Sequence, residues 1–118
     1  MKNLILFALV AGLLFFSLRA VGNIPPADAV RLVKEGAKLV DVRTPAEYAA
    51  GHIEGAINLP LSAIESRAGE LGDQSKPIIL YCRSGNRSGR AAKLLQRLGF
   101  SAVHNLGGMS SWPKGARP

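Results

Sequence analysis

An unbroken apolar run, Pro77-Ile78-Ile79-Leu80-Tyr81, leads directly into a polar loop that starts with the single cysteine of the chain, Cys82. Such a run, without polar alternation, predicts a strand buried on both faces, as in parallel sheets. An amphipathic pattern typical of a helix follows from Gly89 to Leu98. The sequence therefore predicts a strand–loop–helix unit with Cys82 at the carboxyl end of the strand.

The same alternation runs through the rest of the chain. Short apolar segments typical of strands occur at Leu39–Val42, Ala56–Leu59 and Ala102–His104. Helical patterns separate them, at residues 26–35, from Pro45 to Gly51, and at residues 62–71. Strands that alternate with helices predict an α/β domain with a mostly parallel central sheet and helices on both faces.

Two of these helices carry start signals. Thr44 precedes Pro45 and is followed three residues later by Glu47, which predicts a capping box with proline in the first helical position. Ser62 and Glu65 have the same spacing, and we expect a second capping box there.

Residues 1–22 differ from the rest of the chain. A positive start at Lys2 is followed by an apolar stretch from Leu4 to Phe16 and then by small residues at Ala20 and Gly22. This pattern is typical of a signal peptide cleaved after Gly22. We expect a mature domain over residues 23–118 that is periplasmic or secreted, without stable membrane association after cleavage; an uncleaved segment would instead anchor it to the membrane.

The charge of the chain is uneven. Its formal net charge is +7, and beyond Asp73 there are eight basic residues and no acidic one. A positive half favours small anionic substrates. Nucleic acid is not an expected partner, because aromatic residues do not alternate with the basic ones.

The loop that starts at Cys82 has the composition of an anion site. Its residues are Cys82-Arg83-Ser84-Gly85-Asn86-Arg87-Ser88, and a helix is predicted just after them. Backbone N–H groups of such a loop can point inward as an anion nest, and the helix N-terminus adds partial positive charge. We expect a lowered pKa for the Cys82 thiol and a positive φ angle at Gly85. A thiol–disulfide exchange enzyme would need a C-x-x-C pair, which the sequence lacks.

The loop resembles the active-site loop of rhodanese-type sulfurtransferases. Two further segments resemble other signatures of that family: one runs from Asp41 to Pro60, and the other from Asn105 to Trp112. The three segments match the family in order and spacing and together span about Ile24 to Trp112. The chain is similar to the single-domain exported members of the family.

This resemblance implies a thiosulfate sulfurtransferase with Cys82 as the catalytic residue and a Cys82 persulfide as the intermediate. The sulfur donor would be a small anion such as thiosulfate, and the acceptor would be cyanide or a thiol, including a protein thiol. The residues expected to bind the substrate are Arg83, Ser84, Gly85, Asn86, Arg87 and Ser88. No cofactor and no metal is implied.

Three alternatives stay open at this point. Phosphatases and arsenate reductases of this fold have a longer C-x₅-R loop, whereas Cys82 and Arg87 form C-x₄-R. A binding or scaffold module without turnover would often lack the cysteine. A sulfur carrier would keep the cysteine and pass its sulfur to one protein partner.

Several polar residues outside the loop are assigned supporting roles. Asp41 and Arg43 lie at the end of a predicted strand, and we expect them to brace the loop through a salt bridge or hydrogen bond. Glu47 is expected to cap its helix rather than act as an acid. His52 has no neighbour at metal-ligand spacing and is interpreted as a hydrogen-bonding group of a turn.

Overall fold

The computed structural model describes residues 22–116. The predicted export segment, except Gly22, lies outside them. Within residues 22–116, no helix has the length and apolar character needed to cross a membrane. The predicted division into a signal peptide and a mature domain therefore stays a prediction.

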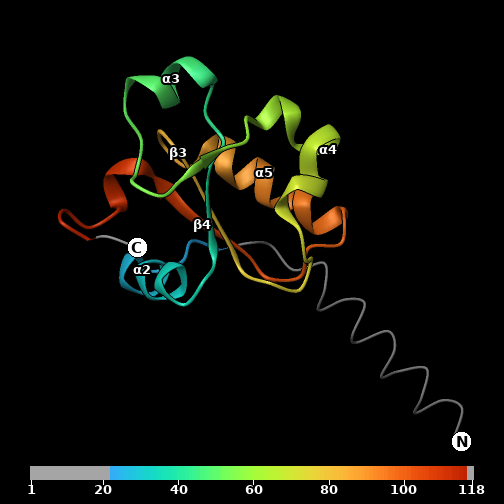
Figure 1. Ribbon diagram of the computed structural model, residues 1–118, viewed down its shortest axis with the longest axis horizontal. Helices are drawn as coiled ribbons and strands as arrows, with labels where there is room; N and C mark the ends of the chain where they lie inside the picture. Colours follow the sequence, from blue (N-terminus) through green and yellow to red (C-terminus); the bar gives the residue numbers. More distant parts are fainter. Residues whose placement is uncertain (1–21, 117–118) are drawn as a thin grey trace, which may run out of the picture.

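The described part is an α/β fold, as predicted, with strands and helices alternating along the chain (Figure 1). The strands are β1 (Lys38–Asp41), β2 (Ile57–Asn58), β3 (Ile78–Cys82) and β4 (Val103–Gly108). The α-helices are α2 (Pro26–Lys34), α3 (Pro45–Ala50), α4 (Ile64–Arg67) and α5 (Asn86–Arg97). Three 3₁₀ turns complete the fold: η1 (Leu61–Ala63), η2 (Ala68–Leu71) and η3 (Met109–Ser111).

The four strands form one parallel sheet in the order β2-β1-β3-β4. β3 is central, and all five of its residues are buried, as the apolar run predicts. All strands point the same way, so their carboxyl ends meet at one edge of the sheet, where ligands bind in open α/β folds. Cys82 lies at that edge.

Helices cover both faces of the sheet. One core contains Val40, Leu80 and Cys82 from the strands and is closed by α4, η2 and α5. The other contains Leu39, Ile79 and Tyr81 and is closed by α2 and η3. Successive residues of β1 and β3 thus enter opposite cores, which is the alternation expected of a strand.

The largest departures from the expected boundaries are in three places, and β1 and β2 differ by one residue at each end. Helix α5 begins at Asn86 rather than Gly89, because Gly85 adopts a φ of +96° and lets the helix start directly after the loop. Strand β4 extends to Gly108, well past His104, because its backbone continues to pair with Tyr81 and Cys82 beyond an irregularity next to Leu80. The segment from 61 to 71 is the short α-helix α4 between the 3₁₀ turns η1 and η2, instead of one continuous helix.

The expected capping box at Ser62 was wrong, whereas the one at Thr44 is confirmed. Ser62 lies inside η1, and α4 begins after Ala63 without a side-chain cap. At α3, the Thr44 hydroxyl accepts a hydrogen bond from the Glu47 N–H at 3.2 Å, and the Glu47 carboxylate accepts one from the Thr44 N–H at 3.3 Å. The capping box at Ser62 does not form because η1 begins directly after Pro60, which places Ser62 inside this 3₁₀ turn rather than before a helix.

Candidate active site

The Cys82 thiol lies inside the loop that joins β3 to α5. The side chain is fully buried. Its sulfur accepts a hydrogen bond from the Gly85 N–H at 2.9 Å and another from the Ser88 hydroxyl at 3.3 Å. The loop therefore curls around the sulfur and directs donors towards it, as expected for an anion nest.

These donors favour the ionised form of the thiol. Burial works to raise the pKa of Cys82, but the hydrogen bonds from Ser88, Gly85 and Ser84 outweigh it and lower the pKa below its ordinary value. The start of α5 adds the partial positive charge of a helix N-terminus. The structure thus supports the expected direction of the pKa shift, and hydrogen bonding is its cause.

Ser88 has a choice of acceptors. Its hydroxyl lies 3.3 Å from the Cys82 sulfur, 3.2 Å from the Gly85 carbonyl oxygen and 3.5 Å from the Gly107 carbonyl oxygen. A hydroxyl has one proton to donate, so these contacts compete. A negatively charged sulfur is the strongest of the three acceptors, and ionisation of Cys82 therefore directs the Ser88 proton towards it.

The backbone of β4 forms a wall against the Cys82–Ser88 loop. A Cβ atom built on Gly108 would lie 2.7 Å from the Arg83 carbonyl oxygen, and one built on Gly85 would lie 3.2 Å from the Gly107 Cα. Asn105 joins this wall: its side-chain amide donates to the Gly85 carbonyl oxygen at 3.4 Å and its side-chain oxygen accepts from the Gly107 N–H at 2.9 Å. The loop and β4 are held close because these glycines carry no side chain.

The remaining loop residues divide by exposure. Arg83, Ser84 and Asn86 are exposed, Arg87 is partly buried and Ser88 is buried. Of the predicted substrate-binding residues, Gly85 and Ser88 donate hydrogen bonds to the Cys82 sulfur, whereas the side chains of Arg83, Ser84 and Asn86 are exposed.

Arg87 is held by a residue that the sequence did not connect with it. Its guanidinium donates to both oxygens of Glu47, at 2.6 and 2.9 Å. This pairing lowers the pKa of Glu47 to about 2 and raises the pKa of Arg87. Glu47 therefore serves both α3, as a cap, and the loop, as the counter-charge of Arg87. The two residues are far apart in sequence, so only the fold reveals the contact.

Asp41 and Arg43 form a buried ion pair at the end of β1. The Arg43 guanidinium binds the Asp41 carboxylate with distances of 2.6 to 3.0 Å and also donates to the Gly51 carbonyl oxygen at 2.7 Å. The Asn58 amide donates to the carbonyl oxygens of both residues at 3.0 Å. This network ties the end of β1 to β2 and to the residue that follows α3. None of these hydrogen bonds reaches the Cys82–Ser88 loop, so the expected bracing of the loop stays a prediction.

The two histidines lie away from the sulfur contacts. His52 stacks on Tyr48 with ring centroids 3.7 Å apart, and its Nδ1 lies 2.9 Å from the Tyr48 carbonyl oxygen, consistent with a group that stabilises a turn. His104 lies on the edge strand β4, and burial lowers its pKa. Over residues 22–116, no group of three potential metal ligands is assembled.

The family model of the rhodanese-like domain matches residues 25–114, which include every residue of this site. The chain belongs to the rhodanese-like family. This confirms the resemblance drawn from the loop and its two flanking signatures. The rhodanese-like domain thus occupies nearly all of the described chain.

Curated relatives include proteins with and without an assigned activity. The chain is 47% identical over 77 residues to the uncharacterized protein YqhL of Bacillus subtilis, covering 64% of this chain and 60% of YqhL. It is 38% identical over 71 residues to thiosulfate sulfurtransferase PspE of Escherichia coli, covering 59% of this chain and 68% of PspE. It is 40% identical over 91 residues to thiosulfate sulfurtransferase GlpE of Pseudomonas entomophila, covering 76% of this chain and 83% of GlpE.

Solved structures show the same fold. A rhodanese with anions from E. coli superposes with a TM-score of 0.62 at 34% identity, covering 64% of this chain and 91% of that one. The domain is thus similar in sequence and in fold to single-domain sulfurtransferases.

Proposed function

We propose that this rhodanese-like domain is a thiosulfate sulfurtransferase that carries sulfur as a Cys82 persulfide. The observation that supports it most is the pair of hydrogen bonds from Gly85 and Ser88 to the Cys82 sulfur. They favour the thiolate, which is the nucleophilic form of cysteine.

In the first half-reaction, the Cys82 thiolate attacks the outer sulfur of thiosulfate. A new sulfur–sulfur bond forms, the bond within thiosulfate breaks, and sulfite leaves with the electron pair. The product is a persulfide anion on Cys82. Its charge lies where the loop N–H groups and the start of α5 stabilise negative charge. Because the Cys82 side chain is fully buried, the rim of the loop has to yield before a donor sulfur can reach it.

In the second half-reaction, an acceptor takes the outer sulfur. Cyanide or a thiolate attacks it, the bond to Cys82 breaks, and Cys82 returns as a thiolate. Electrons balance without an external oxidant or reductant. One cysteine is therefore sufficient for the whole cycle.

The test is the intact mass of the reduced protein before and after thiosulfate, with Cys82→Ser as the control. A gain of one sulfur on the wild type only, removed by cyanide with release of thiocyanate, is the expected result. No gain on confirmed reduced Cys82 would overturn thiosulfate as donor. If the protein gains no sulfur but hydrolyses phosphate esters or reduces arsenate, the site would instead be that of a phosphatase or an arsenate reductase.

We also propose that residues 1–22 direct the domain to the periplasm or the exterior. The support is the apolar stretch from Leu4 to Phe16 followed by Ala20 and Gly22. N-terminal sequencing of the protein from fractionated cells tests this. A mature chain that starts at Asn23 in the exported fraction is expected, and a full-length chain in the cytoplasm would contradict it.

A further inference from the structure

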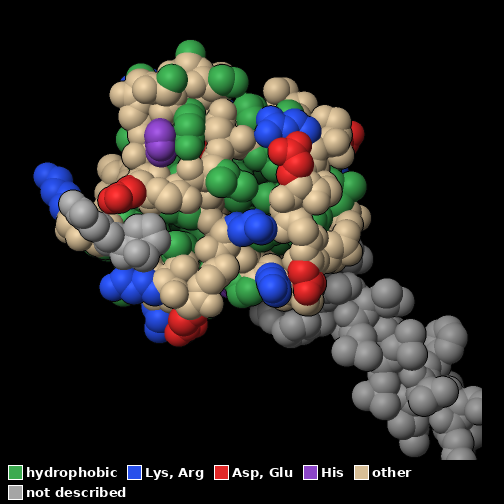
Figure 2. Space-filling view, in the orientation of Figure 1, with side chains coloured by type: hydrophobic (Ala, Val, Ile, Leu, Met, Phe, Trp, Pro, Cys, Tyr) green, Lys and Arg blue, Asp and Glu red, His purple; other side chains and the backbone are tan. Residues whose placement is uncertain are grey.

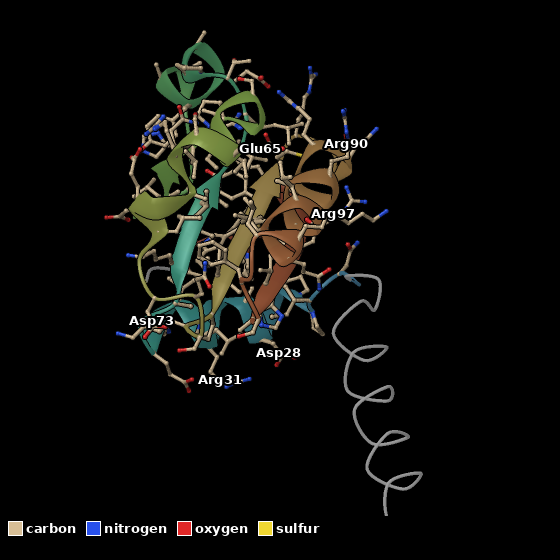
Figure 3. All side chains as sticks on the ribbon, turned by 90° about the vertical axis from the view of Figure 1, so that its right-hand side faces the viewer. Asp28, Arg31, Glu65, Asp73, Arg90 and Arg97 are labelled. Atoms are coloured by element: carbon tan, nitrogen blue, oxygen red, sulfur yellow. The ribbon has the colours of Figure 1, made fainter. Side chains whose placement is uncertain are left out.

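The outer face of α5 carries a row of basic side chains. Arg90, Lys93 and Arg97 are all exposed, and with Asn86 they recur at spacings of three or four residues, which places them on one side of a helix. The opposite side of α5 is buried against the sheet through Ala91, Ala92 and Leu95. Figure 3 shows Arg90 and Arg97 on the outer side of the helix. We call Arg90, Lys93 and Arg97 the α5 basic row.

The residues of the row have no carboxylate partner within residues 22–116, and the same holds for Lys34, Lys38, Lys76, Arg83 and Lys114. Among residues 22–116, Arg31, Arg43, Arg67 and Arg87 each form a salt bridge, whereas the residues of the α5 basic row form none. On the face shown in Figure 2, acidic and basic side chains are interspersed. The charge of the row is therefore left available to a partner.

A groove runs beside the row. It has a volume of about 430 Å³ and is lined by Leu61, Ser62 and Glu65 on one side and by Arg90 and Leu94 of α5 on the other. Figure 3 shows Glu65 and Arg90 on the neighbouring elements α4 and α5. Leu61 and Leu94 offer apolar surface to one side chain of a ligand. Glu65 contributes the one acidic group of this lining, and the α5 wall is basic.

Helix α5, which carries the row, starts in the loop that holds Cys82. Asn86 is both a loop residue and the first residue of α5. At 1.5 Å per residue, Arg90 lies about 6 Å and Arg97 about 16 Å along the helix from Asn86. An extended segment of about five residues spans that length. A bound chain could thus contact the row and the groove while one of its residues reaches the loop.

We propose that the α5 basic row and the groove dock an acidic protein segment whose cysteine accepts the sulfur from Cys82. The inference rests on the proposed function and names its acceptor class. The acidic side chains pair with the row, an apolar side chain enters the groove, and the cysteine faces the loop. The partner thiol gives its proton to water, its thiolate forms a bond to the outer persulfide sulfur, and the bond to Cys82 breaks. A nucleic acid would use the charges but has no use for the apolar surface of Leu61 and Leu94 in the groove.

The experiment uses the full chain with Cys82 first loaded by thiosulfate, and the loading is verified by mass. The acceptors are two hexapeptides: one has a cysteine, a leucine and four acidic residues, and its twin carries the corresponding amides. We expect transfer to the acidic peptide to be about tenfold faster at low ionic strength, because opposite charges steer association. The ratio should fall towards one at about 0.5 M salt as screening shortens the range of the field.

Two variants of equal charge change separate the row from net charge. Arg90→Gln/Lys93→Gln/Arg97→Gln should abolish the preference for the acidic peptide, whereas Arg31→Gln/Lys34→Gln/Lys38→Gln, in α2 and at the start of β1, should keep it. Both should still form the persulfide and lose it to cyanide. Replacing the leucine of the acidic peptide by serine tests the groove and should slow transfer severalfold.

Equal transfer to both peptides by a loaded wild type would overturn the docking proposal and leave the proposed function intact. Failure to load would instead contradict the proposed function. Tighter binding of a short single-stranded oligonucleotide than of the acidic peptide, lost in the row variant, would assign the row to nucleic acid and overturn the proposal as well.

Discussion

Arg87 and Glu47 form a bidentate ion pair that ties the loop around Cys82 to helix α3, with distances of 2.6 and 2.9 Å between nitrogen and oxygen. Both side chains are about one-third exposed. The pair is electrically neutral, so Arg87 brings no uncompensated charge to the loop. Removal of Arg87 alone, in contrast, would leave the Glu47 carboxylate without a counter-charge.

We therefore expect Arg87→Met to raise the KM for thiosulfate by about three- to tenfold, the effect of one unpaired charge near a solvated site. The variant should also raise the pKa of the Cys82 thiol. The double variant Arg87→Met/Glu47→Gln removes both charges and should recover most of the loss. Steady-state kinetics of the two variants test this, and a double variant as impaired as Arg87→Met would show that Arg87 binds the donor directly.

The Tm of the protein at acidic pH should depend on the same Arg87–Glu47 ion pair. Because the pKa of Glu47 is about 2 in the folded protein and 4.5 ordinarily, its ionised form stabilises the fold above pH 4.5, and this contribution is lost as the pH falls towards 2. Glutamine keeps the capping geometry, so Glu47→Gln isolates the charge. We expect its Tm to lie below that of the wild type at pH 6 and to converge with it near pH 2.

The matched control is Glu65→Gln, an exposed carboxylate without a salt bridge among the described residues. Its Tm difference from the wild type should stay nearly constant over the same range. A Glu47→Gln difference that is equally flat would show that the ion pair does not persist in solution.

The Ser88 hydroxyl should set the reactivity of Cys82. Alkylation by iodoacetamide accelerates as the pH rises through the thiol pKa, because the thiolate is the nucleophile. Ser88→Ala removes a donor that lowers this pKa, so the acceleration should move to higher pH and kcat/KM near neutral pH should fall severalfold. Ser84→Ala keeps its backbone N–H and should leave the profile in place; equal shifts in both variants would contradict the assignment to Ser88.

The Asp41–Arg43 pair should matter for stability. Asp41 is fully buried and Arg43 nearly so, and Asp41→Asn would leave the guanidinium without a counter-charge in the interior. Breaking a buried pair in this way costs about 3–5 kcal/mol of unfolding free energy. Urea denaturation measures it. Arg43→Lys, which keeps the charge, should cost less, and a loss below about 1 kcal/mol in Asp41→Asn would contradict the bracing role.

Gly108 tests the shape of the loop. Its φ of −80° suits any residue, so Gly108→Ala acts only through the Cβ that would meet the Arg83 carbonyl oxygen at 2.7 Å. We expect the loop to shift and kcat/KM to fall by about tenfold or more, since small displacements at a reacting centre are costly. Gly69→Ala has open space around its Cβ and serves as the control. Equal activity of both variants would show that the loop tolerates the shift.

The order of elements and the position of Cys82 could be predicted because they depend on local patterns. The run before Cys82 has no polar residue, and parallel strands place their carboxyl ends at one edge. The start of α5 was missed because Asn86 and Arg87 are polar and show no apolar period. The extent of β4 was missed because Gly107 and Gly108 are typical of a turn, although here they pair with β3.

The site was predictable in its residues but not in all of its contacts. Ser88 and Gly85 lie within the loop, so their proximity to Cys82 follows from sequence distance. The partner of Arg87 is forty positions away, and nothing in the spacing of Glu47 and Thr44 beyond the cap indicates a second role. Asn105, which ties β4 to the loop, is likewise brought there only by strand pairing.

The backbone wall around Cys82 has a consequence for how such a site can diversify. Where Gly108 and Gly85 lie against neighbouring main chain, the contact between the loop and β4 is a property of the fold and leaves no room for a side chain at these two positions. The outward positions, Arg83, Ser84 and Asn86, are exposed and free of that packing. Sequence change there can retune which molecules approach while the chemistry at the sulfur is inherited unaltered, so selectivity and reactivity can evolve on separate residues.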